Sequence, residues 1–77
     1  MIRYVFKTDD NMYPITLYYI DDSDFSEKRF DKNTGKWVPT DRIYYALISG
    51  DLDYEEVSLD IARTFAPEAF KEINKNG

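Results

Sequence analysis

Residues 31–36 read Asp-Lys-Asn-Thr-Gly-Lys, and this stretch carries the clearest local signal of the fold. An Asn followed two positions later by a Gly suits a short hairpin, because glycine readily adopts the positive φ that such turns need. We therefore expect Gly35 to have a positive φ. Residues 36–38 would form the returning strand, and Pro39 would end it. The stretch predicts an antiparallel pair of strands.

Further strands are predicted on the N-terminal side of this hairpin. Residues 2–7 alternate with the period of two that is typical of a half-buried strand. Residues 13–20 are largely apolar on both faces, which predicts a central strand, and Pro14 fits best at its beginning. Phe25 and Phe30 bound another strand candidate. Because residues five apart cannot share a face of a regular strand, we expect a bulge or a late strand start there.

The chain then changes from strand to helix periodicity. Residues 1–39 are expected to form a meander of three to four strands, and residues 40–73 a helical part. Thr40 is the predicted N-cap of a first helix over residues 41–49, and Gly50 stands where a C-terminal glycine should.

A second helix is predicted to open at Asp53 and Glu56, whose spacing is a variant of the capping box. Its apolar stripe at helical spacing comprises Val57, Ile61, Ala62 and Phe65. Pro67 is expected to end or kink this helix, or to start a last short one in which Phe70 and Ile73 point inward.

These elements predict one α+β domain over residues 1–77, a length that suits a single domain. It would consist of a small antiparallel sheet of three to four strands followed by two to three short helices packed on one face. Trp37 and Phe65 are the expected core anchors between sheet and helices. Residues 74–77 are expected to fray.

The composition excludes several classes of chemistry. The chain holds no cysteine and no histidine, which excludes disulfide frameworks, zinc–thiolate sites, histidine-ligated metals and serine–histidine triads. Its three glycines are scattered, so no glycine-rich loop that cradles phosphate is predicted. We therefore expect a protein that is not an enzyme and that binds no cofactor and no metal.

Acidic residues gather between residues 51 and 60, where five acids and no base equal the net charge of −5. Their spacing fails the calcium-loop pattern, because Glu56 stands where that loop needs glycine and Ala62 where it needs glutamate. One interpretation is a solvated helix start. Such a surface repels phosphate, so duplex DNA is not an expected partner.

The tyrosines indicate protein contacts. Tyr18 and Tyr19 must lie on opposite strand faces, and Tyr44 and Tyr45 lie about 100° apart on a helix, so a small core cannot hide all four rings. Tyrosine is enriched at protein interfaces. We hypothesise a non-catalytic protein–protein interaction module, with a protein partner or a second copy in a homodimer. The candidate interaction surface comprises Tyr18, Tyr44, Tyr45, Asp51, Asp53, Glu55, Glu56 and Asp60.

Two alternatives stay open on the sequence. The acidic segment would also suit a nucleic-acid mimic, an inhibitor that occupies the basic site of a nucleic-acid-binding protein. A weak single-stranded nucleic-acid binder would instead use the hairpin over residues 28–37, where bases lie beside aromatic rings. Its candidate residues are Lys28, Arg29, Phe30, Lys32, Lys36 and Trp37.

The N-terminal segment does not have the continuous apolar stretch of a signal peptide. The longest apolar cluster, residues 43–48, is far shorter than the roughly 18 residues that a membrane span needs. The sequence therefore predicts a soluble, cytoplasmic protein without a membrane partner.

Overall fold

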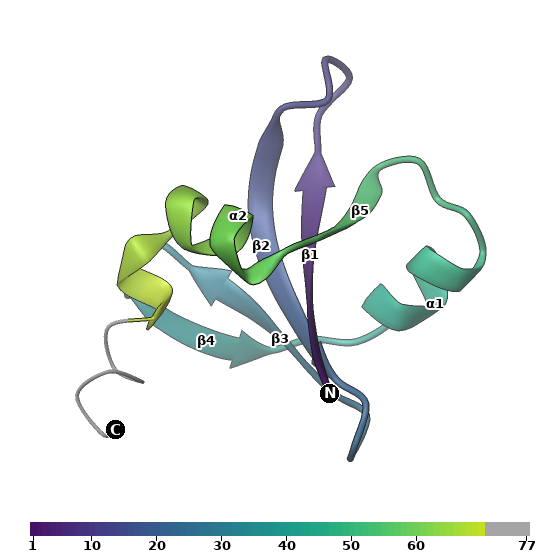
Figure 1. Ribbon diagram of the computed structural model, residues 1–77, viewed down its shortest axis with the longest axis horizontal. Helices are drawn as coiled ribbons and strands as arrows, with labels where there is room; N and C mark the ends of the chain where they lie inside the picture. Colours follow the sequence, from purple (N-terminus) through teal and green to yellow (C-terminus); the bar gives the residue numbers. More distant parts are fainter. Residues whose placement is uncertain (71–77) are drawn as a thin grey trace.

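The computed structural model describes residues 1–70 and shows one antiparallel sheet of five strands (Figure 1). The strands are β1 (Ile2–Thr8), β2 (Pro14–Asp21), β3 (Ser26–Asp31), β4 (Lys36–Pro39) and β5 (Tyr54–Val57). Their order across the sheet is β4-β3-β2-β1-β5. The first four strands form the predicted meander, and β2 lies at its centre, as its apolar character on both faces indicated.

Three short helical elements complete the described part of the chain. They are α1 (Ile43–Ile48), α2 (Leu59–Phe65) and the 3-10 helix η1 (Pro67–Phe70). The α+β class is therefore confirmed, with one strand more than predicted. Ile73 and residues 74–77, for which burial and fraying were predicted, lie outside the described residues. Within residues 1–70, no helix has the length and apolar character that crossing a lipid bilayer requires.

The sheet buries side chains on both of its faces, and a helix covers each. One core comprises Phe6, Leu17, Phe30, Ala62, Ala66, Ala69 and Phe70, which joins β1, β2 and β3 to α2 and η1. The other comprises Val5, Tyr18, Ile20 and Ile43, which joins β1 and β2 to α1. The prediction that all helices pack on one face is wrong. Because adjacent strand residues such as Val5 and Phe6 are both buried and point to opposite faces, each face needs its own cover.

The predicted second helix is half strand and half helix. Its first residues form β5, which pairs with β1 so that Glu55 lies opposite Phe6. The predicted capping box at Asp53 and Glu56 is wrong, because α2 begins later: the Ser58 hydroxyl is its N-cap and accepts a hydrogen bond from the backbone nitrogen of Ile61 at 3.2 Å. The backbone groups of β1 need partners on both sides, and this requirement outweighs the weak helical preference of four residues.

The first helix is capped from another strand. The predicted cap at Thr40 is wrong, since Arg42 is the N-cap, with φ 68° and no side-chain hydrogen bond. Instead the carboxylate of Glu27, on β3, accepts hydrogen bonds from the backbone nitrogens of Ile43 at 2.7 Å and Tyr44 at 3.3 Å. A carboxylate at this end also complements the helix dipole.

Both predicted glycine positions are confirmed. Gly35 has a φ of +71° in the hairpin between β3 and β4, and Gly50 has a φ of +79° after α1. The backbone nitrogen of Gly50 bonds the carbonyl of Leu47, and that of Asp51 bonds the carbonyl of Ala46. This is the paired hydrogen-bond pattern of a Schellman helix end.

Two aromatic residues link the sheet to the helices, as predicted, although both are half-buried rather than fully buried. The indole nitrogen of Trp37 donates a hydrogen bond to the carbonyl of Ala69 at 3.2 Å. The ring centroids of Phe65 and Phe6 lie 5.0 Å apart. The late strand start is also confirmed, because β3 begins only after Phe25, which has a φ of 60°.

Candidate functional site

The three tyrosines of the predicted surface lie in different environments. Tyr18, on β2, is only 7% exposed, and its ring centroid lies 6.0 Å from that of Tyr54, so it belongs to the core. Burial raises the pKa of Tyr18 above its ordinary value. Tyr44 is half-buried, with the guanidinium carbon of Arg3 6.0 Å from its ring centroid. Tyr45 is 69% exposed, and of the three it alone offers most of its ring to a partner.

The five acids of the predicted surface are all exposed, but β5 divides them between two sides of the sheet. Glu55 lies opposite Phe6 in the register and therefore points to the side covered by α2. Glu56 lies opposite Val5 and points to the side covered by α1. Glu55 and Glu56 therefore belong to a strand, and the solvated helix start that was one interpretation of the acidic segment is not formed there.

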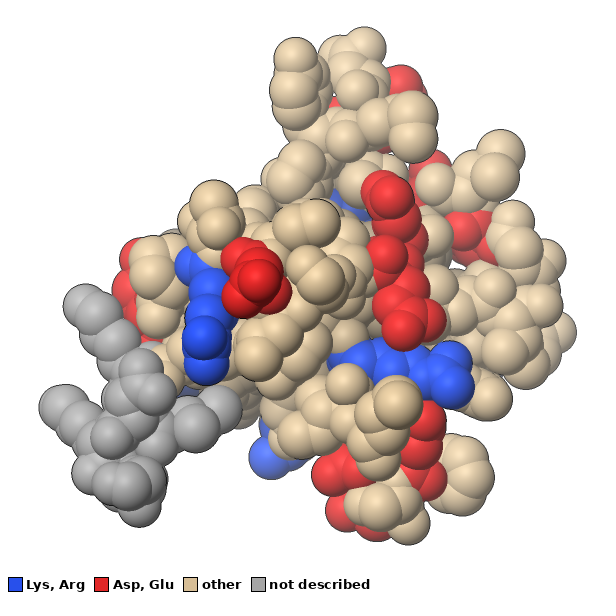
Figure 2. All heavy atoms as spheres, viewed as in Figure 1, with Lys and Arg blue, Asp and Glu red and all other residues tan. Residues whose placement is uncertain are grey.

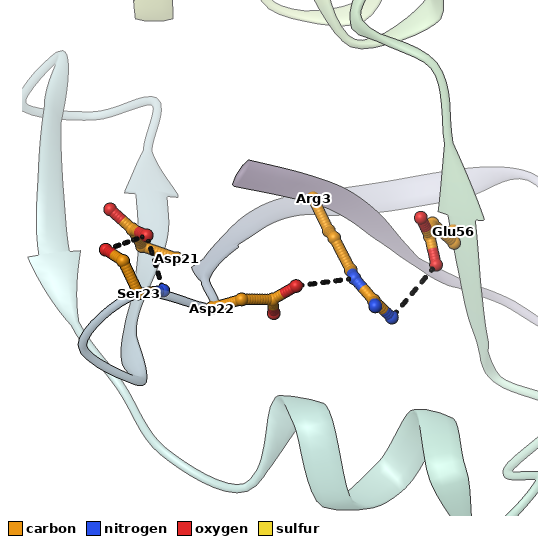
Figure 3. A network of polar contacts seen from close by, with 5 residues as sticks. All are labelled: Arg3, Asp21, Asp22, Ser23 and Glu56. Carbon is orange, nitrogen blue, oxygen red and sulfur yellow. Dashed lines mark hydrogen bonds and ion pairs between the residues drawn. The ribbon is translucent and has the colours of Figure 1, made fainter. Parts of the chain in front are cut away.

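On the α1 side, Arg3 ties three segments together (Figure 3). Its Nε donates a hydrogen bond to Oδ2 of Asp22 at 3.1 Å, and its Nη1 lies 3.8 Å from Oε1 of Glu56. In the adjacent turn, the hydroxyl and backbone nitrogen of Ser23 both donate to the carboxylate of Asp21, which lowers the pKa of that carboxyl. Each of the acids Glu56, Asp22 and Asp21 therefore has a partner within the protein and a role in the fold.

Two more acids shape the turn that leads into β5. Asp51 accepts a hydrogen bond at Oδ1 from the backbone nitrogen of Asp53 at 3.0 Å. The carbonyl of Asp53 accepts hydrogen bonds from the backbone nitrogen of Thr8 at 2.8 Å and from its hydroxyl at 3.3 Å. The two remaining acids lie on the α2 side of the molecule: Glu55 is opposite Phe6 on the neighbouring strand, and Asp60 is on α2 itself.

A groove that the sequence did not predict lies on this same side. It separates α2 from the base of the β1–β2 hairpin, which projects beyond the rest of the sheet (Figure 1), and it has a volume of about 430 Å³. Its lining comprises Phe6, Pro14, Asp60, Ile61, Thr64 and Phe65. Ile61 is 51% exposed there. The Thr64 hydroxyl donates a hydrogen bond to the Asp60 carbonyl at 3.0 Å, so the polar group of Thr64 is directed to its own helix.

The hairpin beside the groove also exposes apolar residues near its turn. Met12, Tyr13 and Ile15 are all large and exposed. The turn that holds them is ordered by Asp9, whose Oδ1 accepts hydrogen bonds from the backbone nitrogens of Asn11 at 2.9 Å and Tyr13 at 3.0 Å. The groove therefore lies next to a hairpin turn that exposes several apolar side chains.

Charges around the groove are unevenly placed. Asp60 stands in the first turn of α2, and Arg63 in its last turn. The guanidinium carbon of Arg63 lies 5.9 Å from the ring centroid of Phe70, and Nζ of Lys32 lies 3.8 Å from that of Phe65. Figure 2 shows acidic side chains over β5 and beside α2, with mostly uncharged surface between them and the hairpin. The groove is therefore acidic toward β5 and basic toward the end of α2.

The hairpin proposed for single-stranded nucleic acid directs its rings inward. Phe30 belongs to the buried core, and its ring centroid lies 5.4 Å from that of Trp37. Lys28 lies with its Nζ 5.9 Å from the ring centroid of Tyr19. The rings that would stack on bases are thus packed against other rings of the protein.

The sequence contained one signal for the groove. Ser58 precedes a helical run and is an N-cap residue type. The helix that starts after it, α2, buries Ala62 and leaves Ile61 half-exposed. The described residues bring together no group of three acidic side chains able to hold a metal ion.

No protein-family model matches this chain, and comparison with curated proteins and with solved structures finds no significant match.

Proposed function

We propose that this protein is a non-catalytic protein-binding module and that it contacts its partner through the groove between α2 and the β1–β2 hairpin. The observation that supports the proposal is the apolar lining of that groove, in which Ile61 is half-exposed beside Phe6 and Phe65. Exposed apolar surface costs about 25 cal/mol per Å² relative to burial. Contiguous exposed apolar surface in a soluble domain marks interaction sites.

The chemistry of the lining favours binding over catalysis. Asp60 is the one ionisable group among the lining residues, and the hydroxyl of Thr64 donates to a backbone carbonyl. General acid–base and nucleophilic catalysis both need paired groups within hydrogen-bond reach. Four apolar side chains around one carboxylate instead suit a side chain that inserts from a partner.

The other candidate functions have weaker support. A nucleic-acid mimic needs its acids arrayed on one surface, whereas Glu55 and Glu56 point to opposite sides and Glu56 faces Arg3. A single-strand binder needs free rings, whereas Phe30 and Trp37 pack together. Homodimerisation and a cytoplasmic location stay predictions.

Two matched variants test the proposed surface. Ile61→Asp places a charge in the groove, and Ile48→Asp places the same charge on α1, where Ile48 is 65% exposed. Each protein would be immobilised and incubated with lysate of the source cells, and the bound proteins quantified by mass spectrometry. We expect a specific partner that Ile61→Asp loses and Ile48→Asp retains. Equal capture by the two variants, or no specific capture by the wild type, would contradict the proposal.

A further inference from the structure

We infer that the groove receives a basic amphipathic segment of a partner protein, which seats one large apolar side chain against Ile61 and places its lysines or arginines along the acidic end. This inference rests on the proposed function and adds the chemistry of the partner. It follows from the size of the groove and from the distribution of charge around it.

The acidic end of the groove is formed by two elements. Asp60 is part of the lining itself. Glu55 lies opposite Phe6 on neighbouring strands, with both side chains on the α2 side. Because the Cβ atoms of such a pair lie about 4.5–5.5 Å apart, Glu55 is a direct neighbour of Phe6, which lines the groove.

The turn of the hairpin, residues 9–13, adds further negative charge and no positive charge. Asp9 and Asp10 stand in this turn, and residues 8–27 contain no lysine or arginine. On the other side of the groove, residues 43–62 also contain none. Within these two ranges every charged side chain is acidic, which favours a partner of opposite charge at the Asp60 end of the groove.

The basic groups at the other end give the partner a direction. Lys32 lies over the ring of Phe65, and Arg63 lies in the last turn of α2. At a rise of 1.5 Å per residue, Asp60 near the start of α2 and Phe65 at its end lie about 7.5 Å apart along the helix axis. The positive side chains of the segment therefore lie toward β5 and the hairpin, and its neutral or acidic end toward Lys32.

The dimensions suit a single anchor side chain. At about 430 Å³, the groove lies at the low end of the range of about 300–1,000 Å³ for pockets that bury small ligands. One leucine or aromatic side chain in such a pocket is the usual form of an interface hot spot, with polar residues around it.

The test uses three fluorescein-labelled peptides of about 14 residues. All three share the same helical pattern of apolar and polar positions. The first has leucines on one helical face and lysines on the other. The second replaces the leucines with serines, and the third replaces the lysines with glutamates. Binding to the full chain would be measured by fluorescence anisotropy. We expect the leucine–lysine peptide to bind, and each of the other two to bind about tenfold more weakly or less.

Matched variants separate the groove from general attraction to an acidic protein. Asp60→Lys should weaken binding of the leucine–lysine peptide about tenfold. Asp41→Lys, at an exposed aspartate before α1, should change it by less than about twofold. Ile61→Asp should abolish binding and Ile48→Asp should retain it. A milder variant, Ile61→Ser, and circular dichroism of every variant would exclude unfolding as the cause.

The outcomes distinguish this inference from the proposed function. Equal loss with Asp60→Lys and Asp41→Lys overturns the inference, because binding would then follow net charge alone. If the leucine–glutamate peptide binds more tightly than the leucine–lysine peptide, and Ile61→Asp abolishes this binding, the inference is overturned. The groove would still be a binding site. A dimer seen by analytical ultracentrifugation and abolished by Ile61→Asp would make a second copy the occupant, and would also overturn it. Binding of all peptides unaffected by Ile61→Asp would overturn both proposals.

Discussion

The carboxylate of Glu27, in the middle of the meander, holds the first turn of α1 through a 2.7 Å hydrogen bond from the backbone nitrogen of Ile43. These two residues belong to different halves of the chain, so the bond fixes the helix on its face of the sheet. The N-cap residue itself, Arg42, makes no side-chain hydrogen bond. Glu27 therefore takes the role that a serine or aspartate usually has at this position.

Replacing Glu27 should destabilise the protein more when both of its hydrogen bonds to α1 are lost than when one is lost. Glu27→Ala removes both acceptors and should lower the free energy of unfolding by about 1–2 kcal/mol, the usual effect of losing a helix cap. Glu27→Gln keeps one acceptor oxygen and should cost about half as much, because one hydrogen bond and the charge are lost. Urea titration would measure both. A stability of Glu27→Ala equal to that of the wild type would show that this contact does not hold α1.

Phe25 offers a test of backbone strain. It has a φ of 60° and is 73% exposed, so a bulky residue occupies a left-handed position without burying its ring. Asparagine tolerates this conformation better. Phe25→Asn should therefore raise the free energy of unfolding by about 0.5–1 kcal/mol.

The control for this prediction is the opposite change at a matching position. Gly35 has a φ of +71°, and an added Cβ would meet open space. Gly35→Val should lower the free energy of unfolding by about 1 kcal/mol or more through strain alone. Both variants would be compared in thermal melts. A loss of stability with Phe25→Asn would show that the ring of Phe25 makes a stabilising contact.

The buried Tyr18 predicts a loss of stability in alkali. Its pKa in the folded protein is raised, first by burial and then by the neighbouring Tyr54, above the ordinary value of 10.0. The stability contributed by the protonated phenol is fully present below that ordinary pKa. It is lost as the pH rises through the folded value, because the unfolded chain gives up its proton first.

Urea titrations at about pH 8 and about pH 11 would measure this effect. Stability should fall between the two, and the fall should be smaller in Tyr18→Phe, which has no proton to lose. Tyr4→Phe should act in the same direction, because burial also raises the pKa of Tyr4. An identical decrease in the wild type and in both variants would assign the alkaline effect to other groups.

Local chemistry made much of the fold predictable. Gly35 and Gly50 are required by their own turns, and the two apolar faces of β2 placed it at the centre of the sheet. Residues 54–57 form a strand only because the free edge of β1 needs a partner. Since β1 lies about fifty residues earlier in the chain, a local sequence pattern does not reveal this. The same holds for Glu27, whose partner lies sixteen positions away.

The candidate site was harder to predict because it depends on helix phase. A helix that begins at residue 53 would turn Ile61 inward with the rest of its stripe. Because Val57 belongs to β5 instead, α2 packs on the sheet through Ala62, and Ile61 lines the groove. The burial of Tyr18 was also not predictable from the local sequence, because it depends on α1 covering the second face of the sheet.

The central claim, that the partner binds between α2 and the β1–β2 hairpin, is tested most directly by nuclear magnetic resonance. The ¹H–¹⁵N spectrum of the labelled protein would be recorded during titration with the leucine–lysine peptide. We predict the largest shifts at the backbone amides of Phe6, Ile61, Thr64 and Phe65, which line the groove. Largest shifts at residues 43–48 of α1, with those four amides unchanged, would contradict the account.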